Sequence, residues 1–444
     1  MRWYVRAHKT SARHRAYRPH LEALENRLTP SSLTPVQPTA VPVLVGPTEA
    51  QGSVIPLFST EATNVSGGYV TGAAGSASAE GVAVGADGSV YVTGFLNDAT
   101  VSPNQLAYVK KVTGGTVAYF TAFAVFPDTD TGSTAEGTAI AVDAGGNAYV
   151  SGKAHHSTDN SDNGIYLKLD PTGGTAVYFF YQPGGGPVST NGVAIDTAGD
   201  AVYTGMYSPT ATEHDLLAVR FTPTGTETYG FYYTFGPGSS SQGNADAMPG
   251  TGASTSIVGA ANIPGTTTAQ NAFEAKLDAT GTPTAAAVLT DPTTDTASAI
   301  VLDAAGNSYV AGTLDIGGPT QTGLAAEIDP TLATIIWSTP LAGASSASLT
   351  ANGIARDAAG NVYVTGADAS GKAYVSQLSG TGTILDYTVF GGTGGSDVGN
   401  AIAVRASDGH VFDVGTTNSS DFPVTDGSTL NGTTDGFLTE WTFP

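Results

Sequence analysis

Residues that could bind a metal ion gather in one short polar segment. Asp159 and Asp162 follow the pair His155 and His156, and the intervening residues are mostly Ser, Thr, Asp and Asn. Carboxylate oxygens suit calcium. We therefore predict a loose calcium site at Asp159 and Asp162, and no other cofactor. The alternative is an acidic loop that is simply solvated.

A second set of carboxylates recurs in turns of the form Asp-x-x-Gly-Asn or close variants of it. The four aspartates are Asp143, Asp196, Asp303 and Asp357. Each could contribute to a cation site, because carboxylates and backbone carbonyls are calcium ligands. Each could instead accept hydrogen bonds from the N–H groups of its own turn, with Gly and Asn at positive φ. A single carboxylate per copy favours the structural role.

These turns belong to a longer pattern, Val-Ala-x-Asp-x-x-Gly-Asn-x-Tyr-Val-x-Gly. Good copies are Ala141–Gly152, Val301–Gly312 and Ala355–Gly366, and weaker copies lie between and around them. The glycines that close the copies are Gly94, Gly152, Gly205, Gly259, Gly312, Gly366 and Gly415. A recurrence of roughly 50 residues predicts a repeat protein whose units cannot bury their apolar faces alone.

Each unit reads as four short strands. In the second unit these are Thr138–Val142, Ala148–Ser151, Gly164–Leu169 and Thr175–Tyr181. Turn residues separate them, and a polar loop over Lys153–Asn163 joins the second strand to the third. In the third strand Ile165, Leu167 and Leu169 alternate with Tyr166 and Lys168, as expected for a strand with one face buried.

Seven such units predict an all-β, seven-bladed β-propeller of four-stranded antiparallel blades over residues 53–444. The last unit ends at Phe437–Trp441, which corresponds to a third strand. We expect a strand near Gly68–Thr71, at the N-terminal side, to complete that blade and close the ring. A right-handed β-solenoid is the rival architecture, but the repeat is long for one of its coils.

The repeats resemble the bacterial SBBP β-propeller repeats, which are related in pattern to NHL repeats. The resemblance rests on the Asp-Ala-x-Gly-Asn-x-Tyr-Val-x-Gly signature, on strands such as Ala275–Asp278 and on the loop Asn418–Pro423. It covers roughly residues 60–444 and implies the propeller fold without implying an activity. The fourth unit departs from the signature, since Ala253 and Ser254 stand where Asp and Gly-Asn are expected.

In a propeller the first strand of each blade faces the axis, and the residues that open these strands line a rim. Those residues are Glu80, Thr138, Asn191, one near Ala245, Ser298, Asn352 and Asn400. The rim is thus small and polar, and no second carboxylate accompanies Glu80 for paired acid–base chemistry. We predict a non-catalytic scaffold or binding module whose protein or carbohydrate ligand contacts this rim and the loops 153–163 and 416–424.

Two other functions stay open. One is an enzyme, a lyase or glycan hydrolase, that uses an axial pocket; facing carboxylates or histidines in the channel would support it. The other is an architectural envelope protein whose acidic surface binds calcium.

The N-terminal residues differ from the rest of the chain. Residues 1–31 are basic, and Leu21–Leu28 resembles the LE-x-LE-x-R-x-L motif of large exported bacterial proteins, which implies an extracellular or cell-surface location. No standard secretory signal is visible in this segment. Residues 32–52 are rich in Pro, Thr and Val and are expected to form an extended linker.

Composition excludes several classes of partner. The formal net charge is −22, which disfavours nucleic acid. There is no cysteine, and therefore no disulfide or thiolate site. No apolar stretch is long enough to span a bilayer as a helix. We expect a monomer.

Overall fold

The structure is a computed structural model. It describes residues 43–44, 63–69, 75–97, 105–126, 132–182, 186–210, 213–233, 235, 239–262, 270–289, 294–315, 321–341, 349–425, 428, 430 and 432–443. The predicted export-associated segment, residues 1–31, and most of the predicted linker lie outside these residues.

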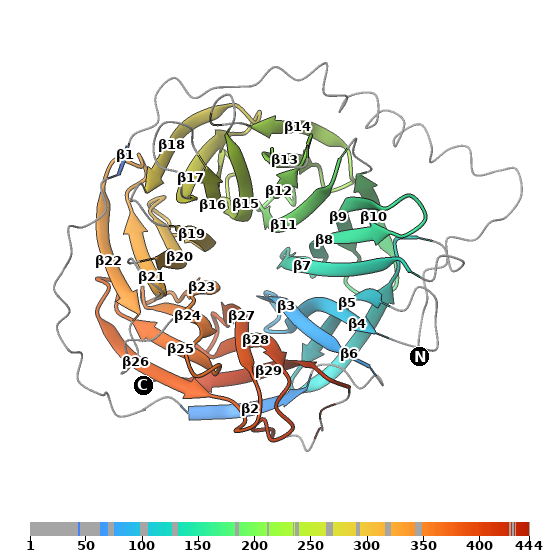
Figure 1. Ribbon diagram of the computed structural model, residues 1–444, viewed down its shortest axis with the longest axis vertical. Coiled ribbons are helices and arrows are strands. Elements are labelled where there is room, and N and C mark those ends of the chain that lie inside the picture. The colour runs from blue at the N-terminus through green and yellow to red at the C-terminus, as the bar shows by residue number, and fades with distance from the viewer. Residues whose placement is uncertain are drawn as a thin grey trace, which may run out of the picture.

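Seven antiparallel sheets of four strands form a ring, and the described residues contain no helix (Figure 1). The first blade comprises β3 (Ala77–Val84), β4 (Val90–Asn97), β5 (Gln105–Thr113) and β6 (Thr116–Phe123). The second comprises β7 (Thr134–Val142), β8 (Ala148–His156), β9 (Ser161–Leu169) and β10 (Ala176–Gln182). The third comprises β11 (Val188–Ile195), β12 (Ala201–Tyr207), β13 (Asp215–Phe221) and β14 (Glu227–Tyr233). The fourth blade comprises β15 (Ser240–Ala247), β16 (Ser254–Asn262), β17 (Asn271–Asp278) and β18 (Pro283–Leu289). The fifth comprises β19 (Thr296–Leu302), β20 (Ser308–Asp315), β21 (Gln321–Ile328) and β22 (Ile335–Leu341). The sixth comprises β23 (Gly353–Arg356), β24 (Val362–Ala367), β25 (Ala373–Leu378) and β26 (Ile384–Phe390). The predicted seven-bladed propeller is confirmed.

The seventh blade combines both ends of the propeller sequence. It comprises β27 (Asp397–Val404), β28 (Val411–Thr417), β29 (Asp435–Thr442) and β2 (Thr63–Tyr69). β2 pairs antiparallel with β29, from Thr63 opposite Thr442 to Tyr69 opposite Phe437. The expected closure by an N-terminal strand is confirmed. β1 (Val43–Leu44) adds in parallel to the outer edge of β18.

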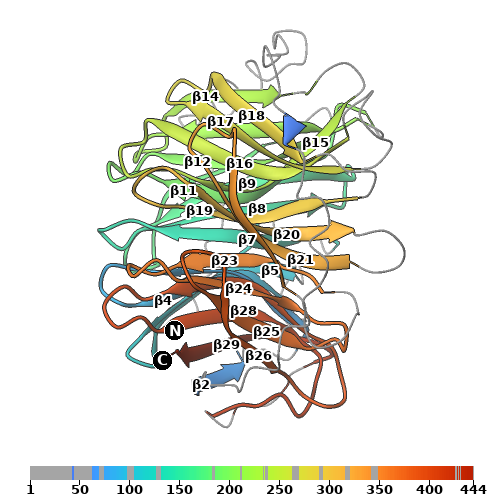
Figure 2. The ribbon, with the colours of Figure 1, turned by 90° about the vertical axis from the view of Figure 1, so that its left-hand side faces the viewer.

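The first strand of each blade lies innermost, and neighbouring inner strands contact one another around the whole ring, including β27 against β3. Figure 2 shows the ring from its side. Apolar side chains fill the spaces between blades; Tyr149 and Tyr203, for example, pack in one cluster across the second and third blades. No helix of the described chain is long and apolar enough to cross a membrane.

In the first two blades the signature tyrosine joins one blade to the next. The Tyr149 hydroxyl donates to the Gly199 carbonyl of the third blade at 3.0 Å and to Asp143 Oδ2 of its own turn at 3.1 Å. Tyr91 reaches the Gly146 carbonyl of the second blade at 3.4 Å. A buried tyrosine needs a partner for its hydroxyl, and here the neighbouring turn supplies it.

The glycine that closes each repeat has a steric cause. At all seven positions a Cβ would collide with a carbonyl oxygen of the adjacent inner strand or, at Gly366, of the segment just before it, and none of the seven has a positive φ. Gly366, for example, faces the Thr350 carbonyl, and Gly152 faces the Glu136 carbonyl. The inner strand bulges next to this contact in most blades, as between Gly137 and Ala139. The close approach of two backbones, and not a left-handed conformation, therefore explains why the signature ends in glycine.

The predicted loop over Lys153–Asn163 is wrong. β8 continues to His156 and β9 begins at Ser161, so a short turn joins two paired strands. Asn160 takes φ +56° in that turn, a conformation that Asn tolerates better than most residues. The polar composition suggested a loop, but residues exposed at the end of a hairpin are polar as well.

Candidate functional site

The rim residues predicted from the sequence occupy equivalent positions in the structure. Each is the extra residue of a bulge in an inner strand or, for Asn352, the residue just before β23. In the fourth blade this position belongs to Asn244, not to Ala245. The seven members, which we call the axial ring, are Glu80, Thr138, Asn191, Asn244, Ser298, Asn352 and Asn400. All are partly exposed.

Most members of the axial ring bind the next blade. The side chain donates to the carbonyl of the residue that precedes the neighbouring ring member. These hydrogen bonds are Thr138 Oγ1 to Thr190 O at 2.7 Å, Asn191 Nδ2 to Gly243 O at 2.8 Å, Asn244 Nδ2 to Ala297 O at 2.8 Å, Asn352 Nδ2 to Gly399 O at 2.9 Å and Asn400 Nδ2 to Ala79 O at 3.0 Å. The ring thus satisfies carbonyls left open by the bulges.

The amide oxygens of the ring are used differently. Asn244 Oδ1 accepts a hydrogen bond from Gln242 at 2.7 Å. Asn191, Asn352 and Asn400 have Oδ1 atoms that accept no hydrogen bond from the described residues. None of these three oxygens is buried without a partner. A ligand with hydrogen-bond donors could therefore use them.

Glu80 has a carboxylate neighbour that the sequence analysis missed. Burial raises the pKa of Glu80, and the charge of Glu136 raises it further, while Lys153 opposes the shift. Lys153 Nζ lies 3.4 Å from Glu136 Oε2, and Asn400 donates to Glu80 at 3.1 Å. The expectation that no second carboxylate accompanies Glu80 was wrong. Glu136 lies in β7, the inner strand of the neighbouring blade, just before the bulge at Thr138.

The predicted calcium ligands lie on the hairpin between β8 and β9. Asp162 Oδ1 is 2.7 Å from His155 Nδ1, and Asp159 Oδ1 is 2.8 Å from His156 Nδ1. Because consecutive strand residues point to opposite faces, the two pairs do not converge. Among the described residues no group of three His, Cys, Asp or Glu side chains could hold a metal ion. Calcium at Asp159 and Asp162 stays a prediction.

The aspartates of the repeated turns cap their own backbone. Asp143 Oδ1 accepts from Gly145 N and Asn147 N, both at 2.9 Å. Burial opposes the charge of Asp143, but hydrogen bonds from Asn147 and Tyr149 outweigh it and lower the pKa. Asp303 and Asp357 bind their turns in the same way. The structural role is confirmed, with one correction.

The correction concerns which turn residue takes the left-handed conformation. Gly146 has φ +82°, whereas Asn147 is not among the residues with positive φ. The Asn side chain instead donates to both carboxylate oxygens of Asp143, at 3.0 and 2.8 Å. It is therefore a second cap on the turn.

The other predicted contact loop, residues 416–424, is held by the loop that precedes β27. Thr393 N donates to Asp421 at 2.9 Å, and Ser396 N donates to Asn418 Oδ1 at 2.6 Å. Phe422 is buried and stacks on Phe437 with ring centroids 4.8 Å apart. The conspicuous polar residues of this loop thus bind the protein's own chain.

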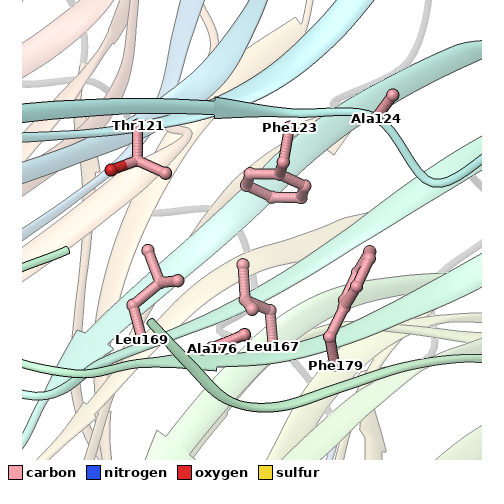
Figure 3. Close-up of a pocket in the computed structure, with 7 residues that line it drawn as sticks. All are labelled: Thr121, Phe123, Ala124, Leu167, Leu169, Ala176 and Phe179. Atoms are coloured by element: carbon pink, nitrogen blue, oxygen red, sulfur yellow. The ribbon is translucent and has the colours of Figure 1, made fainter. Parts of the chain in front are cut away.

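A small apolar cleft lies between the outer strands of the first two blades (Figure 3). Its lining includes Phe123, Leu167 and Phe179, and its volume of about 20 Å³ holds little more than one water molecule. It is a packing gap between blades and does not supply a ligand site.

One family model matches part of the chain. Residues 336–367 match the beta-propeller repeat SBBP. The matched stretch runs from β22 to β24 and contains the repeat turn at Asp357. It supports the resemblance over this one unit. No curated protein matches the sequence.

Several solved structures are similar to this chain at low identity. A protein of unknown function from Dyadobacter fermentans DSM 18053 is 10% identical, with TM-score 0.49, covering 86% of this chain and 99% of that chain. The quinohemoprotein alcohol dehydrogenase of Comamonas testosteroni is 11% identical, with TM-score 0.47 and coverage of 86% and 76%. The endosialidase of phage phi92 is 8% identical, with TM-score 0.47 and coverage of 87% and 70%. At these scores they do not identify an activity for this chain.

Proposed function

We propose that this chain is a non-catalytic, exported β-propeller that serves as a scaffold or binding module for a protein or glycan. The observation that carries the proposal is the axial ring. Its donors hold neighbouring blades together, while the amide oxygens of Asn191, Asn352 and Asn400 stay available on that fixed frame. Acceptors on a rigid ring suit ligands rich in hydroxyl or N–H donors. The location rests on the resemblance of Leu21–Leu28 to an export-associated motif.

Thermal unfolding against a panel of glycans and peptides tests the binding role, because a ligand of the folded state raises the midpoint. Removing the free oxygens in the double variant N191A/N352A should weaken binding at least tenfold. The matched control is Thr138→Val, which loses an inter-blade hydrogen bond but no free amide oxygen. Equal loss in both variants, or no midpoint shift with any compound, would contradict the proposal.

Location is tested separately. Immunodetection of the full chain in the medium and envelope fractions of producing bacteria should find it outside the cytoplasm. A variant that lacks residues 21–28 should remain in the cytoplasm. Export that does not depend on these residues would contradict the role we give them.

The second candidate function is catalysis at the axial rim, and Glu80 with Glu136 favours it. Two neighbouring carboxylates with one raised pKa are the requirement of acid–base glycan chemistry. Incubating the protein with polysaccharides and measuring reducing or unsaturated ends tests this candidate. Activity that disappears in both Glu80→Gln and Glu136→Gln would replace the binding proposal with a catalytic one.

A further inference from the structure

Two positions in the blade interfaces break the pattern of the repeats. The sites equivalent to Asp246 on the inner strands hold Val82, Ile140, Val193, Ile300, Ile354 and Ile402. The sites equivalent to Asp413 on the second strands hold Val92, Val150, Tyr203, Ile257, Val310 and Val364. One unit in seven thus carries a carboxyl group where every other unit carries an apolar or aromatic side chain.

Both carboxyl groups are buried. Asp413 is 0% exposed and Asp246 is 8% exposed, and neither has a side-chain oxygen that accepts a hydrogen bond of normal geometry. Asp246 lies against Gly192 of the third blade, and Asp413 lies beside Thr365 of the sixth blade. Each therefore occupies the contact between two blades.

The groups that face these carboxyls do not compensate a negative charge. Near Asp246 the ionisable neighbours are the phenols of Tyr203 and Tyr229, and near Asp413 the neighbour is Tyr374. Burial raises the pKa of both aspartates well above its usual value, and at Asp246 the Ala194 N–H offsets this only in part. No cation is among the groups that shift either pKa.

We propose that Asp246 and Asp413 are protonated in the folded ring and make two of the seven blade interfaces pH-dependent latches, between blades three and four and between blades six and seven. A neutral carboxyl can donate a hydrogen bond, and the Thr365 oxygen is an acceptor beside Asp413, since its own proton goes to the Tyr374 carbonyl at 2.9 Å. An ionised carboxylate there would be desolvated and unpaired.

The direction of the pH effect follows from the raised pKa. The folded state holds protons that the unfolded state releases above about pH 4. The contribution of these two carboxyl groups to stability is therefore fully present below that pH. It is lost as the pH rises toward the folded-state pKa. Within this window each carboxyl lowers the folding equilibrium constant about tenfold per pH unit.

Urea unfolding of the full chain between pH 4.5 and 8.5, followed by tryptophan fluorescence, tests the latches. In the double variant D246V/D413V, the slope of the logarithm of the folding equilibrium constant against pH should become less negative by up to two. The control Asp421→Asn, at an exposed carboxylate whose pKa is lowered by hydrogen bonds from Thr393, should leave the slope unchanged. The same slope in the double variant and the wild type would overturn the proposal.

A second measurement does not depend on the variants folding. Infrared spectra of the wild-type protein near neutral pD should contain the carbonyl band of protonated carboxyl groups in a protected core. The single variants Asp246→Asn and Asp413→Asn should each reduce it. Its absence from the wild-type spectrum would show that both groups are ionised and would overturn the proposal.

Discussion

At the scale of single residues, the repeat signature consists of residues that make structural contacts. The closing glycine admits a carbonyl oxygen and the aspartate caps its turn, and in the first two blades the tyrosine reaches the next blade. Each residue is explained by a backbone group that would otherwise lack room or a partner. Repetition of a polar residue in this chain is therefore evidence of a structural role first.

Replacing a closing glycine tests this explanation directly. Gly366→Ala places a methyl group against the Thr350 carbonyl, and the segment before β23 must shift to accommodate it. We expect the free energy of unfolding to fall by about 2 kcal/mol or more. Urea unfolding measures the change. The control is Gly394→Ala, where a Cβ would meet nothing within 4 Å; similar losses in both variants would refute the steric cause.

At the scale of elements, the turn between the first two strands is a small charged assembly. Asp143 accepts from its own turn and lies 3.8 Å from Lys168 of β9, whose ammonium group also lies 4.6 Å from the centre of the Tyr149 ring. The turn, the second strand and the third strand are thus tied by one carboxylate. We expect the turns to stabilise their blades through such ties.

The pH dependence of one turn variant checks this expectation. Asp143→Ala should lower the free energy of unfolding at pH 7 by about 1–3 kcal/mol, since the exposed Gly145 N–H and the partly buried Asn147 N–H lose a charged acceptor. The folded-state pKa of Asp143 is lowered, so its contribution is present above the unfolded pKa and is lost as the pH falls through the folded one. The difference between variant and wild type should therefore shrink below about pH 4. A difference that stays constant down to pH 2 would contradict the ionic origin.

At the scale of the whole molecule, stability depends on an unbroken ring of blade contacts. β2 supplies the outer strand of the seventh blade and covers the edge of β29. Without it, β29 would present unpaired N–H and C=O groups to solution, which promotes association of sheet edges.

Truncation tests the closure. A chain that begins at residue 53 keeps β2 and should stay monomeric, whereas a chain that begins at residue 75 lacks it. We expect the shorter chain to unfold at a lower temperature and to self-associate in light scattering. If both chains stay monomeric with the same midpoint, β2 does not hold the ring closed.

The sequence predicted the architecture because periodicity survives substitution. Seven glycines at similar intervals and an incomplete last unit were enough to predict the blades and their closure. The failures were local. Glu136 was missed beside Glu80 because the neighbouring inner strand, not sequence proximity, brings it there, and the hairpin at Asp159 was mistaken for a loop because exposed strand ends are polar too. The use of the ring amides by neighbouring carbonyls depends on bulges that leave no clear mark in one sequence.

The union of β2 and β29 in one blade also sets the order of events in folding. The contact between Tyr69 and Phe437 joins residues from opposite ends of the described chain. It cannot form until synthesis of the propeller is almost complete, and contacts of such long sequence separation are slow to form. Six blades can assemble from residues that are near one another in sequence, while the seventh must wait. During synthesis the chain therefore forms an open arc of blades first, with β2 still without its partner strand.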